Sequence, residues 1–147
     1  MEDELILQDI NKSYGRDILM LRDVNLSLAR GTKLSVLGPS GCGKTSLLRI
    51  IAGLESFDSG RILFNGRSLA QIPSHRRNFG YMFQDFALFP HMNVFENVAF
   101  GLKMKRRSGK DIVTRVDEML ELTGLEGYGR RSIYELSGGE RQRVALA

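Results

Sequence analysis

Two segments near the beginning of the chain have the hydrophobic pattern of half-buried strands. The first contains three apolar residues, Leu5, Leu7 and Ile10. The second, residues 24–28, alternates between apolar and polar side chains, which turns one face of a strand toward a core. Residues 61–64 predict a third strand, because turn-forming residues lie on both sides of them. We therefore expect the first part of the chain to be rich in β-structure.

Two further apolar runs are continuous, and they predict strands buried on both faces. They are residues 33–37 (KLSVL) and residues 78–84 (NFGYMFQ). Continuous runs of this kind are typical of parallel strands at the centre of an α/β sheet. After the first run and a glycine-rich loop, apolar residues recur at helical spacing from 47 to 51, and Gly53 ends the segment. The expected order is strand, loop and helix.

The second part of the chain has the pattern of amphipathic helices. Asn93 and Glu96 have the spacing of a helix cap and its partner, and apolar residues follow at helical intervals. Another helix is predicted at 112–120, before Gly124. The basic segment between these helices, residues 103–107, has no interleaved aromatic residues. We interpret it as a solvated connection and expect no nucleic-acid partner.

Composition limits the class of protein. The 147 residues are 42% hydrophobic and 26% charged, which is typical of a globular chain. No stretch approaches the roughly 18 consecutive apolar residues of a membrane span. The single cysteine, Cys42, excludes an internal disulfide framework and suits a reducing compartment.

The glycine-rich loop at residues 38–45 (GPSGCGKT) fits G-x-x-x-x-G-K-[ST], the pattern of loops that wrap nucleotide phosphates. Glycines permit positive φ and a close backbone approach to anionic oxygens. Lys44 adds charge at the β- and γ-phosphates, and the Thr45 hydroxyl completes a Mg²⁺ shell in such loops. The predicted nucleotide-binding residues here are Gly38, Ser40, Gly41, Cys42, Gly43, Lys44, Thr45 and Ser46.

A second motif, residues 136–143 (LSGGERQR), has two interpretations when it is taken alone. Ser137 and Glu140 have the spacing of a capping box that starts a helix. The two glycines after Ser137 also leave backbone N–H groups uncovered, and a helix N-terminus favours an anion there.

Together, the loop at 38–45, the apolar run ending at Gln84, the helical insert and residues 136–143 resemble ABC-type ATPase domains. The resemblance runs from about Leu5 to the last residue. It implies an α/β P-loop NTPase fold, with a RecA-like core, an antiparallel β portion and a helical subdomain. The expected division of this partial domain, residues 1–147, is a nucleotide-binding core at 1–87 and a helical subdomain at 88–147.

The resemblance also implies roles for individual residues. Tyr14 matches the aromatic residue that stacks on adenine, and Gln84 matches the glutamine that reaches Mg²⁺ and the attacking water. Lys44 and Gln84 are then the catalytic candidates, and Thr45 and Gln84 are the metal candidates, for ATP and Mg²⁺ as cofactors. The family has a motif that binds the γ-phosphate of the nucleotide on the opposite subunit, and the matching residues here are Ser137, Gly138 and Gly139. A head-to-tail pair with a second ATP-binding subunit is expected.

Residues 87–98 (ALFPHMNVFENV) resemble importer subunits of the polyamine, ferric iron, sulfate and sugar group. This implies docking on transmembrane permease subunits, with the protein peripheral at the cytoplasmic face of the cell membrane. One alternative is a soluble ABC ATPase acting on nucleic acid, but the interval between Gln84 and Leu136 leaves no room for a long coiled coil. The other alternative is a non-catalytic ATP-binding module.

The sequence departs from the family pattern at its end. These domains continue to an apolar strand ending in Asp-Glu, which hold Mg²⁺ and activate the attacking water, and then to a switch histidine. The chain ends at Ala147 without them. We therefore expect an N-terminal fragment with uncovered strand edges that binds ATP without hydrolysing it.

Overall fold

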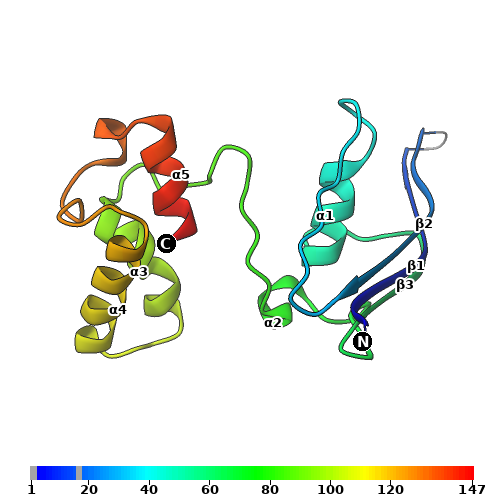
Figure 1. Cartoon of the computed structure of the whole chain (residues 1–147), viewed down its shortest axis with the longest axis horizontal. Coiled ribbons are helices and arrows are strands. Elements are labelled where there is room, and N and C mark those ends of the chain that lie inside the picture. Colours follow the sequence, from blue (N-terminus) through cyan, green and yellow to red (C-terminus); the bar gives the residue numbers. More distant parts are fainter. Residues whose placement is uncertain (1–2, 16–17) are drawn as a thin grey trace. The chain divides into compact units, whose positions relative to one another are not determined.

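The computed structural model describes residues 3–15 and 18–147. The chain divides into two compact units, Met1–Tyr81 and Met82–Ala147. Both units can be followed along the chain in Figure 1.

The first unit contains an antiparallel sheet. Its strands are β1 (Asp3–Tyr14), β2 (Ile18–Ala29), β3 (Ser59–Phe64) and β4 (Arg67–Ser68), in the order β2-β1-β3-β4. The strands predicted around Leu5, at 24–28 and at 61–64 are confirmed. Residues 24–28 alternate between half-buried and exposed positions as expected. One face of the sheet packs on a helix, and the buried residues of this core are Leu7, Ile10, Leu21, Leu47, Ile50, Ile62 and Leu69.

The two buried strands predicted at 33–37 and 78–84 are wrong. Residues 32–39 and 79–83 have no regular secondary structure, and Gln84 begins a turn. Leu37 is 89% exposed and Leu34 is 49% exposed. A strand exists only through hydrogen bonds to a neighbouring strand, and neither run pairs with the antiparallel sheet of the described residues. The apolar pattern predicted buried strands, but in this structure the two segments form no strand and several of their apolar side chains are exposed.

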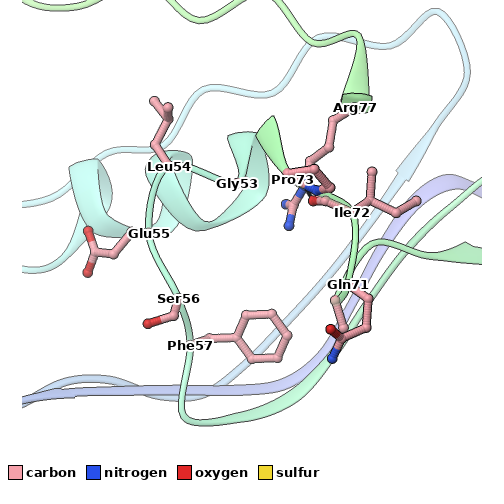
Figure 2. Close-up of a pocket in the computed structure, with 10 residues that line it drawn as sticks. Gly53, Leu54, Glu55, Ser56, Phe57, Gln71, Ile72, Pro73 and Arg77 are labelled. Atoms are coloured by element: carbon pink, nitrogen blue, oxygen red, sulfur yellow. Dashed lines mark hydrogen bonds between the residues drawn. The ribbon is translucent and has the colours of Figure 1, made fainter. Parts of the chain in front are cut away.

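The helix after the glycine-rich loop is α1 (Lys44–Ala52), and it ends as predicted at Gly53, which has φ 76°. A second short helix, α2 (Ser74–Arg77), brings Arg77 back to this end of α1. The Arg77 guanidinium donates to the carbonyl oxygens of Ile50, Ile51, Leu69 and Ile72 at 2.7–2.9 Å. One side chain thereby ties the end of α1 to the segment after β4 (Figure 2).

The second unit is helical. It contains α3 (Val94–Met104), α4 (Gly109–Leu122), a 3₁₀ helix η1 (Ile133–Glu135) and α5 (Gly138–Leu146). The predicted cap is confirmed, because the Asn93 side chain accepts from the Glu96 N–H and Glu96 accepts from the Asn93 N–H. The helices surround a second core of Val94, Ala99, Ile112, Val116, Leu120, Leu125, Leu136 and Val144. Among the described residues, no helix has the length and apolar character needed to cross a membrane.

Candidate nucleotide-binding site

The glycine-rich loop begins α1 without a side-chain cap. Gly43 is the N-cap residue, with φ 90°, and it makes no side-chain hydrogen bond to the N–H groups of the first turn. These N–H groups have no partner inside the helix and carry the positive end of its dipole. Gly38 and Gly41 also have positive φ, 156° and 80°. The backbone is thus arranged to present donors to an anion.

Gly43 has a further reason to be glycine, because the loop packs tightly on β2 at this point. A Cβ atom at Gly43 would lie 2.7 Å from the Cδ2 atom of Leu21 and 2.9 Å from the carbonyl oxygen of Met20. A Cβ at Gly38 would lie 2.8 Å from the Sγ atom of Cys42. A side chain at Gly43 would therefore clash with β2, and a side chain at Gly38 would clash with Cys42 within the loop.

The Lys44 ammonium lies inside the loop. Its Nζ atom donates to the carbonyl oxygens of Gly38 at 2.8 Å and Pro39 at 2.6 Å, and it lies 3.5 Å from the Cys42 Sγ. A cation held by two neutral carbonyls keeps its full charge, so it attracts an anion that approaches the loop. A cavity of about 130 Å³ adjoins it, lined by Met20, Gly41, Gly43, Lys44, Thr45 and Ser46.

Tyr14 lies beside this helix. Its hydroxyl is 2.9 Å from the Ser46 Oγ and donates to the Glu55 carboxylate. Tyr14 is 37% exposed, so part of its ring remains accessible. The structure therefore brings the Tyr14 hydroxyl to Ser46 on α1, next to the loop at 38–45.

The motif at 136–143 starts α5 with a capping box, so the local interpretation of Ser137 and Glu140 holds. The Ser137 Oγ accepts from the Glu140 N–H at 3.3 Å, and the Glu140 carboxylate accepts from the Ser137 N–H at 2.7 Å. The hydrogen bond from the Ser137 backbone lowers the pKa of Glu140. The capping box does not explain Gly138 and Gly139, because a Cβ at the first would meet nothing and at the second only Arg143 at 3.9 Å. Glycine within a helix costs about 1 kcal/mol relative to alanine, so local packing gives no reason for these two glycines.

Gln84 lies in the second unit, at an exposed turn of residues 84–87. The turn is strained, since Phe86 and Ala87 have φ of 64° and 49°. Within residues 3–15 and 18–147, no group of three or more His, Cys, Asp or Glu side chains could hold a metal ion. Thr45 and Gln84 stay predictions as metal candidates, since hydroxyl and amide oxygens are of the kind that Mg²⁺ prefers.

Two residues of the first unit were missed by sequence reasoning. Glu55 contacts Tyr14, and Arg77 holds four carbonyl groups. No local sequence pattern marks either residue. Four of these five hydrogen bonds join residues 8 to 41 positions apart, and the fifth joins Arg77 to Ile72, five positions before it. Only the fold brings these groups together.

A glycine-rich loop, an uncapped helix N-terminus and an ammonium group held by the loop carbonyls define a P-loop protein of the α/β class. The sequence model of the ABC transporter family matches residues 21–147. The chain therefore belongs to the ABC transporter family.

Individual relatives agree with this assignment. The chain is 49% identical over 143 residues to the spermidine/putrescine import ATP-binding protein PotA of Spiroplasma citri. The match covers 97% of this chain but 41% of the relative, so the chain spans about two fifths of its length.

Solved structures show the same fold. A dimeric post-hydrolysis state of the ATP-binding cassette MJ0796 bound to ADP and Pi superposes with a TM-score of 0.85 at 32% identity. A dimeric structure of MJ0796, described as a bacterial ABC transporter cassette, gives 0.85 at 33% identity. Each match covers 97% of this chain and 67% of the other. The predicted α/β P-loop fold of ABC ATPases is confirmed.

Proposed function

We propose that the chain is part of an ATP-binding subunit that powers import by an ABC transporter. The loop geometry carries this proposal: the uncapped N-terminus of α1 and the Lys44 ammonium together match the negative charge of a triphosphate. The 49% identity to an import ATP-binding protein supports import as the coupled process.

The residue roles follow from the same proposal. Residues 38–46 bind the phosphates of ATP, with Lys44 stabilising the charge on the transferred group. Thr45 and Gln84 supply oxygen atoms to Mg²⁺, and Tyr14 stacks on the base. Ser137, Gly138 and Gly139 bind the nucleotide of a second subunit, which is supported by the absence of any packing reason for the two glycines. The dimeric MJ0796 structures support a paired assembly.

The same proposal covers organisation and location. Residues 1–87 form the nucleotide-binding core and residues 88–147 the helical subdomain of one ABC ATPase domain. Residues 87–98 dock on transmembrane permease subunits, which places the protein at the cytoplasmic face of the membrane. The resemblance to importer subunits supports this location.

ATP hydrolysis is the activity of the family, and it needs a residue that activates the attacking water. The 147 residues contain no apolar strand followed by Asp-Glu. A fixed general base contributes roughly 10² to 10⁴ in rate. We therefore propose that these 147 residues bind ATP without turning it over by themselves.

Binding of a fluorescent ATP analogue with Mg²⁺ tests the proposal. Lys44→Ala removes the ammonium from the loop, and loss of a charged hydrogen bond of about 1.5–3 kcal/mol corresponds to a loss of affinity of about tenfold or more. Lys110→Ala, at an exposed lysine in the first turn of α4, is the matched control and should bind like the wild type. Equal affinity in the wild type and Lys44→Ala would exclude a phosphate-binding role for the loop.

A further inference from the structure

The hydroxyl group of Tyr14 connects three parts of the first unit. Tyr14 is the last residue of β1, and its hydroxyl contacts Ser46 on α1 and Glu55 on the segment after α1. Glu55 also lines an open pocket together with Phe57 and Ile72, and in Figure 2 its side chain points away from those two residues.

The ring of Tyr14 has one face covered. The Lys12 Nζ atom lies 5.4 Å from the ring centroid, in the geometry of a cation–π contact. Lys12 is itself held in place, since it is buried and its Nζ atom lies 3.9 Å from the Asp58 Oδ1 atom. Asp58 also accepts from the backbone N–H of Ser13 at 2.7 Å. Tyr14 is 37% exposed, so a planar ligand can reach the part of the ring that Lys12 leaves uncovered.

Stacking depends on how well the ring is held before the ligand arrives. A tyrosine side chain with a free hydroxyl samples several rotamers, and a ligand must then select one of them. Fixing the ring in the binding orientation removes this cost from the binding free energy. The Glu55 carboxylate supplies a charged acceptor for the hydroxyl, which makes the stronger class of hydrogen bond.

We propose that Glu55 is a positioning residue for the nucleotide base. Through the Tyr14 hydroxyl it holds the ring beside Lys12 and presents the exposed part of the ring to the base. This inference rests on the proposed function, because it requires a nucleotide whose phosphates lie in the loop at 38–45. It adds a determinant of base binding that lies outside every motif in the sequence.

Two ligands separate base binding from phosphate binding in the full chain: ATP, and inorganic tripolyphosphate, which has no base. Glu55→Ala should weaken ATP binding about fivefold, as expected for one net hydrogen bond, and leave tripolyphosphate binding unchanged. Glu55→Gln should recover part of the ATP binding lost in Glu55→Ala, because its amide oxygen still accepts from the hydroxyl but makes the weaker, uncharged hydrogen bond. In a Tyr14→Phe background, Glu55→Ala should have no further effect on ATP binding. Glu121→Ala, at an exposed carboxylate on α4, is the control for the loss of a negative charge.

The outcomes distinguish this inference from the proposed function. If Lys44→Ala weakens the binding of both ligands while Glu55→Ala changes neither, the loop function stands and the role of Glu55 is refuted. Equal loss of ATP and tripolyphosphate binding in Glu55→Ala would also refute it, because a general structural effect would then explain both. A wild-type chain that binds neither ligand would remove the proposed function and this inference with it.

Discussion

Substitution of Gly43 by alanine tests whether the phosphate loop depends on its contact with β2. The change has two effects. It places an alanine at φ 90°, a backbone conformation that residues with a Cβ rarely adopt. The new Cβ would also lie 2.7 Å from the Leu21 Cδ2 atom and 2.9 Å from the Met20 carbonyl oxygen. Leu21 is buried, and the Met20 oxygen belongs to the backbone of β2, so neither can move freely.

The magnitude follows from adding these effects. A left-handed conformation costs a residue with a Cβ about 1–2 kcal/mol. Overpacking against a fixed neighbour typically costs a further 1–3 kcal/mol. Restriction of the unfolded chain by alanine returns about 0.4–1 kcal/mol. The expected loss of stability in the first unit is about 3 kcal/mol.

Gly41→Ala is the matched control, because it lies in the same loop at φ 80° but its Cβ would meet nothing within 4 Å. It should cost about 1 kcal/mol from conformation alone. Native-state hydrogen exchange at the Leu47 amide, which donates to the Gly43 carbonyl at 2.9 Å, measures the opening free energy of this unit without assuming that the whole chain unfolds together. Equal losses in the two variants would refute the steric argument, since only Gly43 has the close contacts.

Two further predictions concern Arg77 and Glu140. Arg77→Ala should destabilise the first unit by about 3 kcal/mol in the same exchange experiment, because it removes a charged donor from four carbonyl groups. Arg77→Lys should restore little of this stability, since a single ammonium cannot reach all four carbonyl groups. Near-complete recovery of stability with lysine would contradict this prediction. The pKa of Glu140 is lowered from 4.5 by the Ser137 backbone hydrogen bond, so its contribution to α5 is complete above that pH and is lost as the pH falls through the lower folded value. Amide protection in the first turn of α5 should therefore decline below about pH 4.5 in the wild type but not in Glu140→Gln, and identical pH profiles would exclude this carboxylate as the cause.

The sequence by itself determined the elements whose causes are local. The caps at Asn93 and Ser137 and the end of α1 at Gly53 each depend on groups within a few positions, so their residue types predict them. The strands at 24–28 and 61–64 were also predictable, the first from its alternation of apolar and polar residues and the second from the turn signals on both sides of it. The loop at 38–45 was also predictable from local sequence, since each of its glycines occupies a position with positive φ that favours glycine.

Only the tertiary structure decided the features that need a distant partner. The runs at 33–37 and 78–84 have the composition of strands, but a strand forms only when another strand accepts its hydrogen bonds. The contact between Tyr14 and Glu55 spans 41 positions, and the Arg77 guanidinium reaches back 27 positions to Ile50. Neither partner leaves a periodic or spacing signal in the sequence, because the contact is made by the packing of α1 against the sheet and not by the local chain.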